Sequence, residues 1–252
     1  MPTREPVPER VWVFDFDGTL SSLVADRGAA ALLPEARELL SGLVRLPRQA
    51  TAVLSSRLLD DLAARVDFRG LYLGGGSGAE WLLPGGERRT ADSKTRRLRH
   101  IRSAVLPALE RLREIPGVDL EDKRWSVAVH VRQAAPDERP GVLSFLESLV
   151  RTTGIRLLRG PEVFEILLLP EIDKLFGAVV LCEMLRHVPS PGSLVYAGDD
   201  ENDTMAMEWV IRNGGIALSV GAETLIPGVR LVDGPSALVR EVRRLAGLDE
   251  KG

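Results

Sequence analysis

The sequence is poor in cysteine and contains no long apolar run. Its one cysteine, Cys182, excludes an intrachain disulfide framework and a cysteine-based zinc site. No apolar run reaches the ~18 residues that a membrane-spanning helix needs, and the polar segment Met1–Arg10 does not resemble a signal peptide. These absences lead us to expect a soluble cytoplasmic protein that does not insert into a membrane.

Neither sign of charge dominates the composition. Lys and Arg total 33 and Asp and Glu total 36 among 252 residues, which gives a formal net charge of −3. This balance argues against a protein that coats nucleic acid or an anionic membrane. Hydrophobic residues make up 44% of the chain and charged residues 27%, so a sizeable core can form. The length allows one large domain or two modest ones.

The first part of the chain alternates short apolar runs with helical patterns. Apolar runs at 11–14, 50–54 and 71–73 are each followed by polar or glycine residues, which is typical of strands buried on both faces. Between them, 34–45 and 58–66 have the residue spacing of helices. Strands that alternate with helices predict a parallel sheet with right-handed crossovers.

A different pattern then interrupts this alternation. A long, arginine-rich helix is expected at 93–114. Apolar and polar residues alternate strictly at 124–131, which indicates a half-covered, antiparallel strand. A helix near 138–152 and strands at 155–158 and 163–168 complete a small α+β unit.

The first pattern returns after this unit. The expected elements are helices at 174–187 and 236–245, a further helix that includes residues 205–210, and strands at 193–197, 215–220 and 229–232. We therefore predict an α/β fold in which 1–92 and 171–252 form one core. The predicted insertion is an α+β domain at 93–170.

Acidic and hydroxyl side chains follow several of the expected strands. Asp15 and Asp17 come after the first strand, Ser55 after the second, and Asp199 and Asp200 after a later one. In an open parallel sheet, ligands bind beyond the carboxyl ends of the strands. Carboxylates that converge there repel one another unless a cation neutralises them, and oxygen ligands suit Mg²⁺. The pattern therefore predicts a magnesium site.

These residue types suit phosphoryl transfer through a covalent intermediate. The carboxylate of Asp15 can act as the nucleophile and form an acyl phosphate. Asp17 can protonate the leaving oxygen and later activate water. Mg²⁺ and Lys174, at the start of a helix, would hold the phosphoryl group. Ser55 offers a hydroxyl and a backbone amide to a phosphate oxygen.

Each of these features has a simpler interpretation when it is taken alone. An isolated Asp-x-Asp-Gly or Gly-Asp-Asp sequence is more often a turn, and a lysine at a helix start is usually solvated. Their occurrence together and in this order, each after an apolar strand or at a helix start, favours a phosphotransfer site.

The same residues resemble the motifs of the haloacid dehalogenase superfamily of phosphotransferases. The first motif is similar to Asp15–Leu20, the second to Ser55, the third to Lys174 and the fourth to Gly198–Asp203. The resemblance implies a Rossmann-like parallel-sheet core with an inserted C2-type α+β cap, which covers the site and selects the substrate. It also implies that Mg²⁺ binds Asp15, Asp199 and the backbone carbonyl of Asp17, with Asp200 or Asp203 completing or supporting that set.

Further motifs resemble the trehalose-6-phosphate phosphatase family, almost from end to end of the chain. They are Ser55-Ser56-Arg57, Gly78-Ala79-Glu80, Glu121-Asp122-Lys123, His130-Val131-Arg132 and Glu165. The resemblance implies a phosphoric monoester hydrolase of trehalose biosynthesis that acts on trehalose 6-phosphate. The substrate-binding residues that it implies are Arg57, Glu80, Glu121, Lys123, His130, Arg132 and Glu165. Of these, Glu121, Lys123 and Glu165 would bind the glucose unit remote from the phosphate.

The sequence also departs from that family pattern. Ser56 replaces a glycine, Ser77 replaces a histidine, and Asn202 to Met205 replaces a Thr-Asp-Glu-Asp sequence. These departures leave other substrates open, namely glucosyl- or mannosyl-3-phosphoglycerate, sucrose phosphate, or a trehalose-like pseudosugar phosphate. A further alternative is a catalytically silent partner of a trehalose-6-phosphate synthase, which the intact catalytic residues disfavour. An active enzyme would have a functional link to such a synthase.

Several of the implied binding residues have structural alternatives. His130 can equally be a partly exposed strand histidine with satisfied hydrogen bonds. Glu121 and Lys123 can form a solvated pair. The expected partner of Arg57 is a phosphate or Glu80, and Arg132, two residues from His130, is expected to share its face of the strand and to reach a phosphate or a sugar.

Overall fold

The structure, a computed structural model, describes residues 6–24, 27–160, 162–221 and 226–248. The chain forms two compact units, Met1–Arg89 with Lys174–Gly252, and Thr90–Asp173. The predicted insertion at 93–170 lies within the second unit. Residues 1–5, on which the expectation about a signal peptide partly rests, lie outside the described residues.

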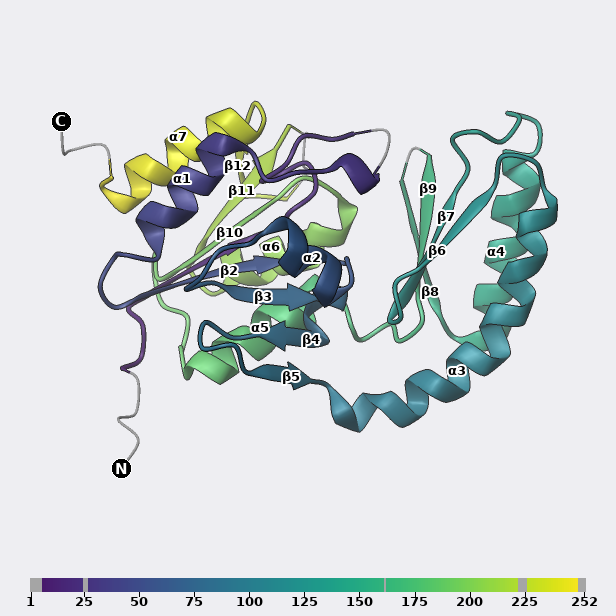
Figure 1. Ribbon diagram of the computed structural model, residues 1–252, viewed down its shortest axis with the longest axis horizontal. Helices are drawn as coiled ribbons and strands as arrows, with labels where there is room; N and C mark the ends of the chain where they lie inside the picture. Colours follow the sequence, from purple (N-terminus) through teal and green to yellow (C-terminus); the bar gives the residue numbers. More distant parts are fainter. Residues whose placement is uncertain (1–5, 25–26, 161, 222–225, 249–252) are drawn as a thin grey trace. The chain divides into compact units, whose positions relative to one another are not determined.

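The first unit is built on an eight-stranded sheet with the order β12-β11-β10-β1-β2-β3-β4-β5 (Figure 1). Its parallel strands are β1 (Arg10–Phe14), β2 (Gln49–Leu54), β3 (Tyr72–Gly75), β10 (Leu194–Gly198), β11 (Ile216–Val220) and β12 (Arg230–Val232). The order of the strands reverses at β1, which lies between β2 and β10 near the middle of the sheet. The predicted α/β fold with parallel strands is confirmed.

Alternation along the central strand assigns the helices to two faces. Trp12 and Phe14 pack into a core with residues of α1 (Pro34–Leu43), α2 (Leu59–Arg65) and α7 (Pro235–Ala246). Val11 and Val13 instead pack with residues of α5 (Lys174–Leu185) and α6 (Thr204–Arg212). These four side chains of β1 are fully buried, while Arg10 at its start is partly exposed. The four residues form an uninterrupted apolar run, because helices cover both faces of the sheet.

Two strands of the first unit were not predicted. β4 (Glu80–Leu82) pairs antiparallel with β3, and β5 (Arg88–Thr90) lies at the edge of the sheet. Each has three residues, and all three residues of β5 are exposed. Neither strand is long or apolar enough to produce a recognisable pattern in the sequence.

The second unit contains a four-stranded antiparallel sheet with the order β6-β7-β9-β8. Its strands are β6 (Asp119–Asp122), β7 (Ser126–His130), β8 (Arg156–Arg159) and β9 (Val163–Leu167). Figure 1 shows α3 (Asp92–Glu110) and α4 (Arg139–Thr153) along one face of this sheet. The antiparallel strand predicted at 124–131 is confirmed. β6 was missed because Leu120 is the single apolar residue among its four, so the strand has no apolar alternation.

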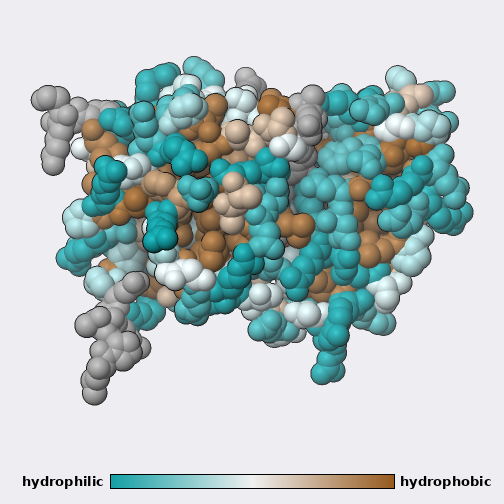
Figure 2. All heavy atoms as spheres, in the orientation of Figure 1, coloured by the Kyte–Doolittle hydropathy of each residue, from teal (hydrophilic) through white to brown (hydrophobic). Residues whose placement is uncertain are grey.

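The hydrophilic surface, the buried cysteine and the lengths of the helices agree with what the composition indicated. In the view of Figure 2, hydrophilic side chains are distributed over both units. Cys182 is 5% exposed and packs in the apolar core beside β1, as expected for a core cysteine. In the described ranges, no helix combines the length and the apolar character that crossing a bilayer requires.

A close backbone approach joins α5 to the turn that follows β3. This turn, Gly76–Gly78, donates the amide of Ser77 to the carbonyl of Ser55 at 2.8 Å. Gly78 has φ +85°, and a Cβ atom there would lie 2.3 Å from the Cα of Gly177 on α5. A backbone contact at this distance requires glycine. The turn therefore holds the start of α5 close to the end of β2.

This contact predicts the effect of adding a methyl group at Gly78. Gly86 has φ +86°, but a Cβ atom there would have no neighbouring atom within 4 Å, so Gly86→Ala reports the backbone strain alone. We expect Gly78→Ala to lower the free energy of unfolding by about 1–3 kcal/mol more than Gly86→Ala does, because of the added steric overlap. Urea denaturation of both variants measures the difference. Equal losses would show that the helix moves away without cost.

Candidate active site

Lys174 contacts two buried carboxylates at the carboxyl ends of the first unit's central strands. Its Nζ atom lies 2.7 Å from Oδ1 of Asp15 and 2.7 Å from Oδ1 of Asp203. Lys174 and Asp15 are each 3% exposed, and Asp203 is fully buried. Lys174 begins α5, as predicted. Its burial excludes the solvated lysine that an isolated helix start would suggest.

The parallel pairing of β1 with β10 brings the acidic residues together. Phe14 is in register with Ala197, and the amide of Asp15 donates to the carbonyl of Ala197 at 2.8 Å. The residues that follow the two strands therefore leave the sheet side by side. Gly18 has φ +75°, and a Cβ atom there would lie 2.0 Å from Oδ2 of Asp199. The loop after β1 needs glycine at this position to admit the Asp199 carboxylate.

Hydrogen bonds fix the loop after β10 around Asp203. Its Oδ1 atom accepts from the Tyr196 hydroxyl at 2.6 Å as well as from Lys174. Its Oδ2 atom accepts from the amides of Asp199 at 3.3 Å and Asp200 at 3.4 Å. Asp200 in turn accepts from the amide of Asn202 at 2.9 Å. Asp203 thus orients the loop that carries Asp199.

The carboxylates carry more negative charge than Lys174 balances. Oxygen atoms of Asp15, Asp199 and Asp203 lie within 4.8 Å of one another. Burial, followed by the charge of Asp200, raises the pKa of Asp199 to about 7, although Lys174 opposes the shift. Burial also raises the pKa of Asp15 and of Asp203. A buried set of oxygen ligands with excess negative charge suits a divalent cation.

The carboxylate of Asp17 is bound by Arg57. The Nε and Nη2 atoms of Arg57 donate to its two oxygens at 2.7 and 2.6 Å. The Nη1 atom donates to Asp61 at 2.7 Å, and Asp61 also accepts from Arg65 at 3.0 Å. These guanidinium groups outweigh burial and hold the pKa of Asp61 below its ordinary value. The sequence indicated a phosphate or Glu80 as the partner of Arg57, and it did not indicate either aspartate.

Ser55 is buried where β2 ends. Its amide donates to the carbonyl of Gly74 at 2.8 Å, which continues the pairing of β2 with β3. The expectation that this amide binds phosphate is therefore wrong, because strand pairing already uses it. The Oγ atom accepts from the amide of Arg57 at 3.2 Å. The hydroxyl hydrogen remains the donor that Ser55 can direct to a phosphate oxygen.

Four of the predicted binding residues lie together in the second unit. The Nζ atom of Lys123 donates to Glu165 at 2.8 Å, and Lys123 is 1% exposed. The alternative of a solvated lysine is therefore wrong. Glu121 and Glu165 are in register with Ala128 on either side of β7. The Nε2 atom of His130 lies 3.1 Å from Oε2 of Glu121, so this histidine has a carboxylate partner.

Two other predicted binding residues have different surroundings. β7 ends at His130, so the expectation that one strand carries both His130 and Arg132 is wrong. Arg132 forms an ion pair with Glu162, and half of its side chain is exposed. Glu80 begins β4 in the first unit and is partly exposed.

Sequence reasoning missed two residues that hold the site residues. Tyr196 binds Asp203, and Ser126 donates to Oε1 of Glu165 at 2.5 Å. A tyrosine within a fully buried strand needs a hydrogen-bond partner for its hydroxyl, so the sequence could have indicated Tyr196. Ser126 differs little from its polar neighbours on an alternating strand, and the sequence gives no comparable signal.

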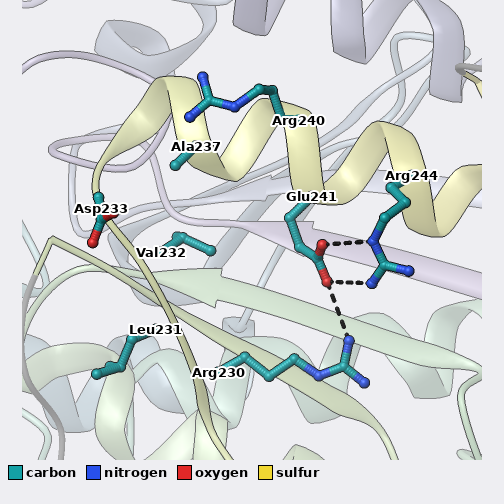
Figure 3. A pocket seen from close by; sticks show the side chains of 8 residues that line it. All are labelled: Arg230, Leu231, Val232, Asp233, Ala237, Arg240, Glu241 and Arg244. Carbon is teal, nitrogen blue, oxygen red and sulfur yellow. Dashed lines mark hydrogen bonds and ion pairs between the residues drawn. The ribbon is translucent and has the colours of Figure 1, made fainter.

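A hollow of about 470 Å³ lies away from these carboxylates, between β12 and α7. Figure 3 shows Arg230 and Arg244 both directed at Glu241. These charges pair with one another, and none of the predicted site residues lines the hollow.

The arrangement of the first unit's sheet identifies the fold. The fold is that of the haloacid dehalogenase-like hydrolases, and one solved example is a hydrolase of this class from Bacteroides thetaiotaomicron. That structure has a TM-score of 0.61 and 15% identity, over 94% of this chain and 99% of its own. The trehalose-phosphatase family model matches residues 13–226. The chain therefore belongs to the trehalose-phosphatase family.

Individual relatives agree with this assignment. The trehalose-phosphate phosphatase of Mycobacterium tuberculosis is 37% identical over 205 residues, which are 80% of this chain and 51% of that protein. The chain thus spans about half the length of the curated relatives that it matches. The C-terminal domain of Candida albicans trehalose-6-phosphate phosphatase has a TM-score of 0.76 and 18% identity, over 96% of this chain and 93% of that one.

The raised pKa of Asp199 predicts how stability depends on pH without metal. Because its pKa of about 7 exceeds the ordinary value of 3.8, the folded state binds the proton more tightly than the unfolded state. The stability that the bound proton of Asp199 contributes is fully present below the unfolded-state pKa and is lost as pH rises through 7. In EDTA, we expect the free energy of unfolding to fall between pH 5 and 7, by at most about 1.4 kcal/mol per pH unit from this group.

Asp199→Asn is the matched variant, because its amide does not titrate. Its unfolding free energy should depend less steeply on pH than that of the unmodified chain, as measured by urea denaturation at each pH. Mg²⁺ added at pH 8 should stabilise the unmodified chain and should stabilise the variant less. Parallel pH profiles for the two proteins would contradict the assignment of this proton to Asp199.

Proposed function

We propose that the protein is a Mg²⁺-dependent phosphatase that hydrolyses trehalose 6-phosphate through an aspartyl-phosphate on Asp15. The observation that carries this proposal is the buried contact between Lys174 and Asp15, with Asp199 close by, in a chain of the trehalose-phosphatase family. Relatives at 34–37% identity bear the name trehalose-phosphate phosphatase. That name motivates the choice of substrate.

The first half of the reaction transfers the phosphoryl group to Asp15. A carboxylate oxygen of Asp15 forms a bond to phosphorus while the bond from phosphorus to the sugar oxygen breaks. Asp17 gives its proton to the departing sugar oxygen, and trehalose leaves as the alcohol. Lys174 and the hydroxyl of Ser55 stabilise the charge on the phosphoryl oxygens during the transfer.

The second half returns the enzyme to its starting state. Asp17, now a carboxylate, takes a proton from water as the water oxygen bonds to phosphorus. The acyl bond to Asp15 breaks, and inorganic phosphate is released. Arg57 contacts both oxygens of the Asp17 carboxylate, so it is suited to hold that group between the two halves.

The residues present fit a bound Mg²⁺. Its ligands would be Asp15, Asp199 and the backbone carbonyl of Asp17, while Asp200 and Asp203 support the loop. When bound, the cation offsets the negative charge of the carboxylates and phosphate and polarises the phosphoryl group. The excess of buried negative charge around Lys174 supports this proposal.

The second unit offers groups suited to sugar hydroxyls. Glu121, Lys123 and Glu165 would bind the glucose unit remote from the phosphate, together with His130. The proposed substrate contacts also include Arg57, Glu80 and Arg132. Arg57 and Arg132 would contact the substrate in addition to their ion pairs with Asp17 and Glu162. A site that binds hydroxyls discriminates strongly against analogues that lack them. A phosphate of another sugar is the alternative substrate.

We also propose a functional link to a trehalose-6-phosphate synthase, which would supply this substrate. The fold resembles the C-terminal domain of a Candida albicans trehalose synthase regulatory protein, with a TM-score of 0.68 and 16% identity. A silent synthase partner is the rival function. Co-purification with a synthase and no phosphate release from any sugar phosphate would favour it.

A panel of substrates tests the proposed function. The panel contains trehalose 6-phosphate, sucrose 6-phosphate, glucose 6-phosphate and the two glycosyl-3-phosphoglycerates. We expect phosphate release with strong preference for trehalose 6-phosphate in Mg²⁺ and none in EDTA, with activity restored by excess Mg²⁺. Preference for another member would retain the chemistry of Asp15 and reject the substrate. Full activity in EDTA would reject the role of the metal.

Asp15→Asn tests the nucleophile. The amide removes the attacking oxygen charge with little change in volume, so turnover should fall by at least about 10³-fold while the fold persists. Phosphate release measures activity, and circular dichroism verifies the fold. Glu87→Gln, an exposed carboxylate on a turn of the same unit, is the matched control and should retain activity. Substantial activity in Asp15→Asn would reject the covalent mechanism.

A further inference from the structure

Both oxygens of the Glu165 carboxylate are held by neighbouring side chains. Glu165 lies in the middle of β9 and is 7% exposed. Its Oε1 atom accepts from the Ser126 hydroxyl at 2.5 Å, and its Oε2 atom accepts from the Lys123 ammonium at 2.8 Å. Ser126 begins β7, and Lys123 directly follows β6. Donors from two other parts of the sheet therefore converge on this one buried carboxylate.

We propose that Ser126 is a positioning residue for substrate specificity, which orients Glu165 to accept hydrogen bonds from sugar hydroxyls. The inference rests on the proposed function, because it assigns a sugar to the second unit. Ser126 lies outside all the sequence motifs that indicated the substrate. It acts through Glu165 and has no part in phosphoryl transfer.

The orientation of a glutamate carboxylate is weakly determined by the side chain itself. Its terminal torsion has a broad, roughly two-fold energy profile, so one hydrogen bond leaves the carboxylate plane loosely defined. Lys123 binds one oxygen as a charge that can contact it from several directions. The Ser126 hydroxyl binds the other oxygen, and the two contacts together define the plane of the group.

An oriented carboxylate of this kind retains capacity for a ligand. An ionised carboxylate has about four acceptor positions. Lys123 and Ser126 use one position on each oxygen. The positions that remain point in directions set by the plane, and a sugar hydroxyl is a donor that fits them. Burial strengthens such bonds, because water competes less for the carboxylate.

A second carboxylate in the same row is also held. Glu121 lies across Ala128 from Glu165 and contacts His130. The two carboxylates are thus two acceptors on one sheet, and each contacts a neighbouring side chain. A molecule with several hydroxyls can contact both, whereas a phosphate group alone would be repelled by them. The row therefore favours the sugar part of a substrate.

The test compares a sugar phosphate with p-nitrophenyl phosphate, which has no sugar hydroxyl. Ser126→Ala should raise KM for trehalose 6-phosphate about five- to tenfold, as expected for one lost hydrogen bond to a charged acceptor, with kcat within twofold. Both constants for p-nitrophenyl phosphate should stay unchanged. Ser126→Thr, which keeps the hydroxyl, should restore most of the affinity.

Ser236→Ala is the matched control. Ser236 donates to Glu35 at 2.8 Å at an exposed site, so its removal deletes the same type of bond elsewhere. This control should leave both substrates unaffected. An equal effect of Ser126→Ala on both substrates, or no effect on trehalose 6-phosphate, would overturn the inference. Thermal unfolding of each variant verifies that the fold is intact.

The inference and the proposed function fail in distinguishable ways. Turnover of trehalose 6-phosphate by the unmodified chain decides the proposed function. Calorimetric binding of trehalose 6-phosphate to Asp15→Asn, with and without Ser126→Ala, tests the inference without turnover. A five- to tenfold weaker binding in the double variant supports the inference. Equal binding by the two proteins, or no binding by either, contradicts it.

Discussion

The ammonium group of Lys174 lies between the buried carboxylates of Asp15 and Asp203, and the acidic site depends on this contact. Loss of either partner charge from a buried pair is strongly destabilising, because the remaining charge has no water around it. The contact therefore requires the start of α5 to lie against the ends of β1 and β10. Glycine at positions 78 and 177 allows the backbone approach that places α5 there.

The two units solve different electrostatic problems. In the first unit, burial, together with neighbouring carboxylates that Lys174 only partly offsets, raises the pKa of Asp15, Asp199 and Asp203. Such an arrangement of like charges is costly, and the proposed Mg²⁺ would offset it. In the second unit, Glu165 has Lys123 and Ser126 as partners, and Glu121 has His130. The ammonium group of Lys123 offsets the charge of Glu165 within the protein, which suits this carboxylate to neutral hydroxyl groups.

The sequence predicted those parts of the structure that local patterns determine. Short apolar runs identified β1, β2 and β10, and the polar residues after them identified the carboxyl ends of the strands, where the site lies. The strands β4, β5 and β6 were missed because they are short and offer few apolar residues. Partners of long side chains were also missed, since Arg57 meets Asp17 across 40 residues of chain. The tertiary fold decides such pairings, and residue spacing carries no record of them.

The contact between Arg57 and Asp17 extends the site into α2. Arg57 uses its Nε and Nη2 atoms on Asp17 and its Nη1 atom on Asp61, while Asp61 also binds Arg65. The guanidinium also lies over the ring of Phe16, 5.6 Å from its centre. A lysine has neither the planar set of donors nor the stacking face, so it cannot bind both carboxylates in this geometry. Asp17 is therefore bound by a residue of the loop before α2, and α2 holds that residue through Asp61. One loop thus carries both Ser55, the proposed donor to the phosphate, and Arg57, which binds the proposed acid Asp17.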